Sequence, residues 1–212
     1  MKRISVYMLS VVFLTAGVIS CGKTTRGKMV NDWNVVSSSQ EYNYVSQTGE
    51  KLLVTEVSAD NSYTIKTTHT SPSDSTTETT SSTLTVVENS WSIKKDGTWI
   101  WKKHLRNPSG SIQEDLITTH SGTWSFIKNN KTDEFKKNER VIFNVLLLEE
   151  RQILSSDITT STSYLTGEKS LIFSVKESGK KLLEMEYEAN NLYSGSGSET
   201  QTLIKKLSVT LN

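Results

Sequence analysis

The chain has 212 residues, which is one domain's worth of sequence and enough to bury a sizeable core. Its 24 basic and 23 acidic residues leave a net charge of +1, which excludes a strong overall field that would attract nucleic acid. Roughly a quarter of the residues are Ser or Thr, and so polar a composition is also compatible with disorder. Five Trp residues and many alternating apolar segments instead favour a folded all-β domain.

The first residues have the pattern of an export signal. Lys2 and Arg3 precede a mostly apolar stretch, residues 4–18, which is short for a membrane-spanning helix. The stretch ends in Val-Ile-Ser-Cys at 18–21, which resembles the lipobox of bacterial lipoproteins. That resemblance implies that residues 1–20 are cleaved, that the Cys21 thiol receives diacylglycerol, and that residues 21–28 form a lipidated tether. The alternative is an ordinary secretory signal followed by a chance Cys.

The lipid anchor would make the membrane a partner of the chain. Cys21 is the only cysteine, so an intrachain disulfide is impossible. The tether lacks the acidic run associated with export to the outer face of the outer membrane in Bacteroidota. We therefore expect a protein of the cell envelope, anchored in the outer membrane and facing the periplasm.

Candidate strands recur along the mature chain with turn residues between them, as in a sandwich or barrel. They are residues 33–38, 52–58, 63–69, 84–94, 98–105, 112–119, 123–128, 141–148, 171–176, 182–189 and 202–211. Helical periodicity is weak everywhere. Residues 141–154 fit a buried strand or a short helix, and the β-branched and aromatic start of this segment favours a strand.

Residues 70–82 are rich in Ser and Thr and contain no apolar side chain to bury, so we expect a mobile loop. Within it, Asp-Ser-Thr at 74–76 resembles the O-glycosylation site that Bacteroidota use on exported proteins. That resemblance makes Ser75 a candidate for glycosylation.

Two related segments, Gly-Thr-Trp-Ile-Trp at 97–101 and Gly-Thr-Trp-Ser-Phe at 122–126, each place a Gly at the close of a turn and aromatic residues at alternate positions after it. A two-residue turn before the first segment would pair Ile93 with Ile100. A three-residue turn, Lys95-Asp96-Gly97 with a left-handed Gly97, pairs Ile93 with Trp99 instead. The second register collects the aromatic residues on one face, and we predict it for that reason.

This aromatic face has two interpretations. The side chains either fill a hydrophobic core or line a cavity, where they would bind an apolar ligand or stack on sugar rings. In the second case the candidate ligand-binding residues are Trp91, Trp99, Trp101, Trp124 and Phe126.

The lipobox, the short tether, the early Trp33 and the two Gly-Thr-Trp strand starts together resemble the lipocalin-like lipoproteins of Bacteroidota. The resemblance implies an antiparallel up-and-down β-barrel of about eight to ten strands over residues 29–212. The chain departs from true lipocalins at Asn31, where their first strand carries a Gly.

The sequence shows no catalytic constellation, so we expect a protein that is not an enzyme and holds no cofactor. His69, His104 and His120 lack the spacing of metal ligands, and no metal site is expected. Two functions remain open. The barrel holds a small apolar or amphiphilic ligand, or it is a filled barrel that docks on another envelope protein or a glycan.

Overall fold

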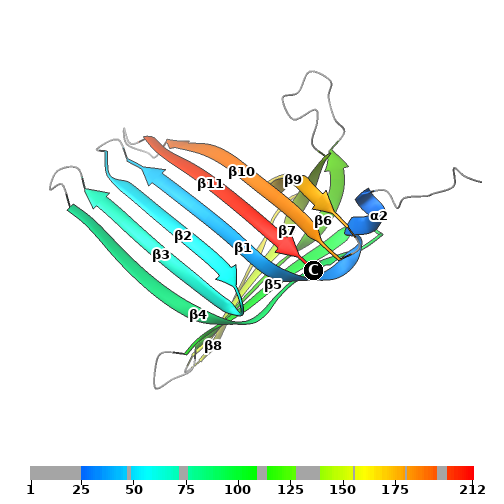
Figure 1. Ribbon diagram of the computed structural model, residues 1–212, viewed down its shortest axis with the longest axis horizontal. Coiled ribbons are helices and arrows are strands. Elements are labelled where there is room, and N and C mark those ends of the chain that lie inside the picture. Colours follow the sequence, from blue (N-terminus) through cyan, green and yellow to red (C-terminus); the bar gives the residue numbers. More distant parts are fainter. Residues whose placement is uncertain are drawn as a thin grey trace, which may run out of the picture.

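A computed structural model describes residues 25–46, 49–71, 76–108, 114–127, 139–154, 156–179, 181–194 and 200–212 (Figure 1). Cys21, Ser75 and the expected signal peptide lie outside the described residues. The elements are α2 (Thr25–Met29), β1 (Asn31–Val45), β2 (Lys51–Ala59), β3 (Ser62–Ser71), β4 (Thr76–Ile93), β5 (Thr98–Asn107), β6 (Glu114–Ile127), β7 (Glu139–Ile153), β8 (Asp157–Ser163), β9 (Ser170–Ser178), β10 (Leu183–Ser194) and β11 (Thr200–Leu211). The segment at 141–154 is part of a strand, as predicted.

The strands form one antiparallel sheet in the order β6-β5-β4-β3-β2-β1-β11-β10-β9-β7-β8. Two additional pairings, β6 with β7 and β4 with β1, close the sheet into a ring. Within the described residues, the β2/β3 hairpin and β8 extend beyond this ring. The expected all-β, up-and-down, barrel-like architecture is therefore confirmed.

The ring is closed at one end only, which we call the closed end. There, residues 31–34 of β1 pair with residues 90–93 of β4. Farther along, from Ser37, β1 pairs with β2 instead, so that the β2/β3 hairpin separates β1 from β4. On the opposite side, β7 pairs with β9 up to Asn144 and with β8 from Leu147 onward.

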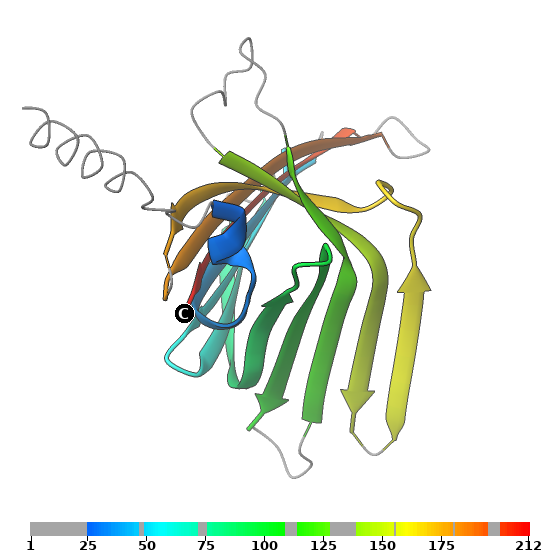
Figure 2. The same ribbon diagram turned by 90° about the vertical axis from the view of Figure 1, so that its right-hand side faces the viewer.

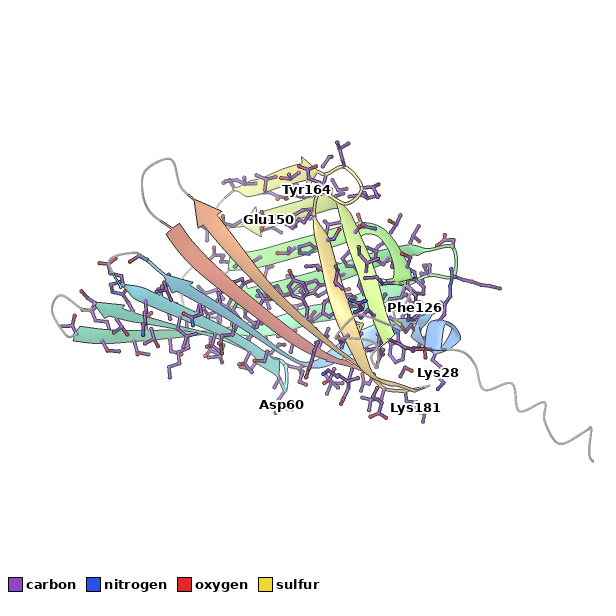
Figure 3. All side chains as sticks on the ribbon, turned by 90° about the horizontal axis from the view of Figure 1, so that it is seen from above. Lys28, Asp60, Phe126, Glu150, Tyr164 and Lys181 are labelled. Atoms are coloured by element: carbon purple, nitrogen blue, oxygen red, sulfur yellow. The ribbon has the colours of Figure 1, made fainter. Side chains whose placement is uncertain are left out.

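Away from the closed end, the sheet consequently diverges into two parts (Figures 2 and 3). The first wall contains β3, β2, β1, β11 and β10, and the second wall contains β5, β6, β7 and β8. β4 connects them, pairing with β3 in its first half and with β5 in its second. Side chains of the two walls that share the face of the core residues are called inward-facing below.

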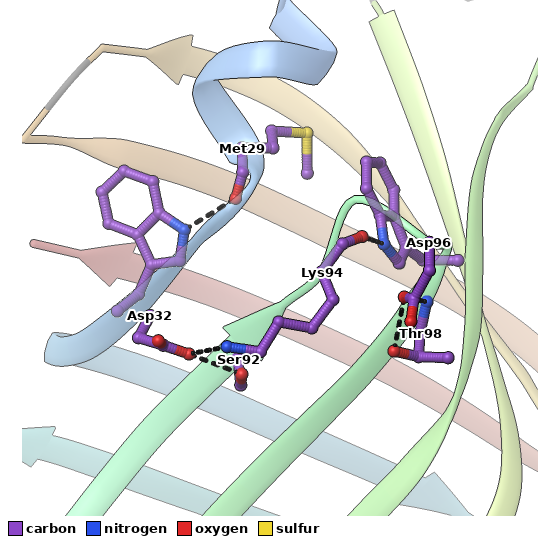
Figure 4. Close-up of polar contacts among 8 residues, drawn as sticks. Met29, Asp32, Ser92, Lys94, Asp96 and Thr98 are labelled. Carbon is purple, nitrogen blue, oxygen red and sulfur yellow. Dashed lines mark hydrogen bonds and ion pairs between the residues drawn. The ribbon is translucent and has the colours of Figure 1, made fainter.

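The hydrophobic core occupies the closed end. Its fully buried side chains come from β1, β4, β5, β7, β9, β10 and β11 and include Trp33, Trp91, Trp99, Phe143 and Phe173. The short helix α2 belongs to the same end, because Met29 is fully buried in the core and its carbonyl accepts a hydrogen bond from Trp33 Nε1 at 2.8 Å (Figure 4). Among the described residues, no helix has the length and apolar character needed to span a bilayer.

The β4/β5 turn confirms the predicted register. Ile93 pairs with Trp99, Trp91 pairs with Trp101, and Gly97 has a φ of 90°. That left-handed conformation is the one that a three-residue hairpin loop requires and that glycine adopts without strain. The Asp96 carboxylate accepts hydrogen bonds from the backbone and the hydroxyl of Thr98, which stabilises the turn (Figure 4).

The second Gly-Thr-Trp segment does not follow a turn. Residues predicted as two strands, 112–119 and 123–128, belong largely to the single strand β6, and Gly122 lies inside it. Gly122 sits at a register shift against β7, where an added Cβ would lie 1.9 Å from the carbonyl oxygen of Asn144. The glycine therefore permits a close approach of two backbones, which is the second common use of Gly in a strand.

The Ser/Thr-rich segment was wrongly predicted as a loop, because residues 76–82 form the first part of β4 and residues 70–71 end β3. Threonines face one another across this hairpin, as in the pair Thr68 and Thr79, whose hydroxyl oxygens are 3.3 Å apart. β-Branched Thr favours an extended backbone even where both faces of the sheet are solvated. The prediction also missed β8, another Ser/Thr-rich strand, whose residues are all exposed.

Candidate functional site

The aromatic residues predicted to contact a ligand meet in one cluster at the closed end. The Trp91 ring stacks against Trp99 on one side and Trp101 on the other, with centroid distances of 5.4 and 5.1 Å. The edges of Phe143 and Phe173 close the cluster around Trp91. Such offset and edge-to-face contacts add to the stabilisation that burial of the rings provides.

Trp124 and Phe126 form a second pair at the same end, with ring centroids 5.9 Å apart. Trp124 is buried beneath the guanidinium of Arg26, and its Nε1 donates to the carbonyl of Lys94 at 2.9 Å (Figure 4). Phe126 is partly buried against the core and is labelled at the same end of the molecule as α2 in Figure 3. The structure thus places all five predicted residues in or against the core.

Hydrogen bonding of the indoles agrees with a packed interior. Trp99 Nε1 donates to the carbonyl of Asn144 at 3.1 Å, and Trp101 Nε1 donates to Oδ1 of Asn89 at 3.0 Å. Trp91 Nε1 is buried and has no hydrogen-bond partner among the described residues.

Trp101 marks the boundary between the core and the inward faces of the two walls. Its exposed fraction is 9%, against 0% for Trp91 and 1% for Trp99. Its ring stacks on the imidazole of His120 from β6, with a centroid distance of 5.2 Å.

Beyond Trp101 lies a polar cluster, made by Glu56, Tyr63, Asn89, Lys103 and His120, that the sequence did not reveal. Lys103 Nζ donates to the Tyr63 hydroxyl at 3.1 Å, and that hydroxyl donates in turn to the Glu56 carboxylate. The ammonium also lies over the Tyr63 ring, 4.6 Å from its centroid, in a cation–π contact. Asn89 is the buried acceptor for Trp101, so the cluster is connected to the aromatic core.

Burial perturbs the two titratable groups that meet in this cluster. Desolvation lowers the pKa of Lys103, and the nearby charges of Glu56 and Glu150 oppose that effect. Desolvation also raises the pKa of the Tyr63 phenol well above its ordinary value, and the Glu56 carboxylate adds to the rise. Titratable groups perturbed in this way are found more often at functional sites than elsewhere.

Apolar side chains surround the cluster on both walls without being fully buried. Val54 of β2, Ile65 of β3 and Leu84 of β4 are inward-facing and half-buried. On the second wall Leu116 and Leu148 are also half-buried, and Ile158 of β8 is 56% exposed. Glu150, labelled on the second wall in Figure 3, is inward-facing and exposed. The site can therefore offer apolar contacts, aromatic faces and a small set of polar groups to one molecule.

The three histidines lie apart. His69 of β3 is exposed, and His120 of β6 faces inward beside Trp101. His104 of β5 points to the opposite face, where its Nε2 lies 3.5 Å from an Asp115 oxygen that Arg106 also binds. Among the described residues, no three His, Cys, Asp or Glu side chains form a group that could hold a metal ion.

Comparisons with protein-family models, curated proteins and solved structures gave no match for this chain. Its function is therefore inferred from the chemistry of its own residues.

Proposed function

We propose that this chain is a lipid-anchored envelope protein that binds one small amphiphilic molecule against the inward faces of its two walls. One observation carries the proposal: inward-facing apolar residues beyond the core stay partly exposed. Ile158 is 56% exposed, whereas the core residues are 9% exposed or less. A ligand with an apolar part would cover these side chains and would gain about 25 cal/mol for each Å² of apolar surface removed from water.

Within this proposal the five aromatic residues have different roles. Trp101 would contact the ligand directly, because it forms the boundary between the core and the inward faces. Trp91, Trp99, Trp124 and Phe126 would support the site from behind, since they pack within or against the core.

Native mass spectrometry of a soluble form beginning at Gly22 tests the ligand. All core residues lie between Met29 and Leu211, so this form retains the whole core. Purified gently from an envelope extract, it should carry an added mass that is lost on denaturation. Trp101→Ala should weaken binding, whereas the outward-facing control Ile100→Ala, 46% exposed in the native protein, should not. A bare protein mass, together with no difference between these variants, would contradict ligand binding.

The anchor would fix the orientation of the domain. The chain takes four residue-to-residue steps from Cys21 to Thr25 and can extend at most about 14 Å over them. α2 is attached to the closed end through Met29. An acylated Cys21 would therefore hold the closed end toward the bilayer and leave the diverging walls farther from it. Cys21→Ser should move the full chain from the detergent phase to the aqueous phase in a phase-separation experiment. Unchanged partitioning would contradict the anchor.

A second candidate function is docking on another envelope protein, and β8 is the observation that favours it. All seven residues of this edge strand are exposed, and within the described residues it pairs only with β7. An unpaired strand edge can accept a strand from a partner. Thr159→Pro would remove one backbone N–H from β8, and it should abolish complex formation under this function while leaving ligand binding unchanged.

A further inference from the structure

Lys103 is a charged residue on the inward face of β5. It alternates along the strand with two buried side chains, Trp101 and Leu105, whose exposed fractions are 9% and 5%. Its neighbour Lys102 points to the opposite face, where it pairs with Glu88 at 2.6 Å. The two lysines are therefore adjacent in sequence but lie on opposite faces of β5, and of the two only Lys102 has a carboxylate partner among the described residues.

Among the described residues, the ammonium group of Lys103 finds fewer hydrogen-bond acceptors than it has N–H donors. Of its three N–H donors, one reaches the Tyr63 hydroxyl. Within the described part of the chain, no carboxylate oxygen lies within 4 Å of its Nζ, whereas Lys94, Lys102 and Lys176 each have a carboxylate at 2.8 Å or closer. The nearby Glu56 carboxylate instead accepts the Tyr63 hydroxyl.

An ammonium in this position is costly when it has no direct counter-ion. Removing a charge from water is unfavourable unless an opposite charge or hydrogen bonds replace the lost hydration. Desolvation lowers the pKa of Lys103, which is the expected sign of incomplete compensation. An anion that reached this group from the side of the two walls would supply the missing partner.

We propose that Lys103 binds the anionic headgroup of a single-chain amphiphile, with the Tyr63 and Trp101 rings flanking the headgroup and the half-buried apolar residues of the walls covering its alkyl chain. The inference rests on the proposed function and adds the chemical class of the ligand. The placement of the chain follows from the inward-facing Val54, Ile65 and Leu116, which lie farther from the closed end than Trp101.

Four probes with the same alkyl chain test this inference: dodecanoate, dodecyl phosphate, dodecanol and dodecyltrimethylammonium. Binding to the soluble form beginning at Gly22 is measured by isothermal titration calorimetry, with the ionic probes below their micelle concentrations and dodecanol below its solubility limit. At least one anionic probe should bind about tenfold or more tightly than dodecanol, as expected for hydrogen bonds to a charged group. The comparison of carboxylate with phosphate shows which anion the site prefers.

Three variants assign the effect to Lys103. Lys103→Met should reduce the affinity for the anionic probe to that for dodecanol, and Lys103→Arg should retain most of the preference because it keeps the charge. Lys102→Met is the matched control and should change neither affinity. Far-ultraviolet circular dichroism confirms that each variant is folded.

The outcomes separate this inference from the proposed function. If dodecanoate, dodecyl phosphate and dodecanol bound with equal affinities that Lys103→Met did not change, the inference of an anionic headgroup would be overturned. The proposed function, binding of an amphiphilic ligand, would still hold. A preference for dodecyltrimethylammonium would also overturn it and would point to Glu56 and Glu150. Failure of all four probes to bind would overturn the inference and the proposed function together.

Discussion

Gly122→Ala tests the close approach between β6 and β7. An added Cβ would lie 1.9 Å from the Asn144 carbonyl oxygen and 2.9 Å from the Leu146 backbone nitrogen, whereas ordinary contacts begin at 3.4 Å. Both neighbours are backbone atoms, so no side chain can rotate away. The two strands would have to separate by about 1.5 Å at the position where their register shifts.

Two costs add up when the strands move. Overpacking of this kind costs about 1–3 kcal/mol. The same Asn144 carbonyl accepts the indole N–H of Trp99, which is 1% exposed, and leaving a buried donor unsatisfied costs about 1–3 kcal/mol more. We therefore expect Gly122→Ala to lower the free energy of unfolding by about 2–6 kcal/mol, which lowers Tm by at least about 4 °C in a domain of this size.

Urea denaturation of the soluble form, followed by tryptophan fluorescence, measures this loss. Gly167→Ala is the control, because Gly167 has a φ of 87° but no atom within 4 Å of the added Cβ. In the control, the free energy of unfolding should fall only by the cost of holding Ala in a left-handed conformation, about 1–2 kcal/mol. If Gly122→Ala were no less stable than Gly167→Ala, the proposed steric role of Gly122 would be refuted.

Three further predictions concern the aromatic and polar clusters. Trp99→Phe should destabilise the domain by about 1–3 kcal/mol more than Trp91→Phe, because only Trp99 loses a hydrogen bond; equal losses in urea denaturation would contradict this. Above pH 10 the unfolded state releases the Tyr63 proton while the folded state keeps it, because burial raises the pKa of this phenol. Stability should then fall with rising pH by up to about 1.4 kcal/mol per pH unit from this group alone. Tyr63→Phe should remove that component, as a comparison of unfolding at pH 9 and pH 11 would show. Without ligand, Lys103→Met should raise Tm at pH 7, because desolvation lowers the pKa of Lys103 and the charged form is therefore disfavoured in the folded protein. An unchanged or lower Tm would contradict the view that the charge of Lys103 destabilises the fold and is retained for ligand binding.

Local chemistry was sufficient to predict the β4/β5 hairpin from the sequence. Two constraints, a left-handed Gly97 and the placement of aromatic residues on one face, both required a three-residue turn, and the structure has it. The same reasoning failed at Gly122, where an identical Gly-Thr-Trp pattern lies inside a strand. A glycine needed for a turn and a glycine needed for a close backbone approach look alike in sequence, because the approaching strand comes from a distant segment.

The prediction of residues 70–82 failed because it depended on burial. Alternation of apolar and polar residues reveals a strand only when one face of the sheet is covered, and residues 76–82 of β4 are exposed throughout. Their β-branched side chains and the Thr–Thr pairs across the hairpin favour the strand without any burial. Strands that extend beyond the core are therefore better recognised by backbone preference than by hydrophobic pattern.

The polar cluster shows where inference from sequence reached its limit. The alternation of Trp101, Lys103 and Leu105 in the sequence already implies that Lys103 shares the face of the buried residues. No local pattern places Tyr63 and Glu56 opposite that lysine, because both belong to the hairpin inserted between β1 and β4. That insertion separates the two walls beyond the closed end, and it also brings the phenol and the carboxylate to the ammonium. One topological feature thus produces both the exposed inward faces and the polar group that would select an anionic ligand.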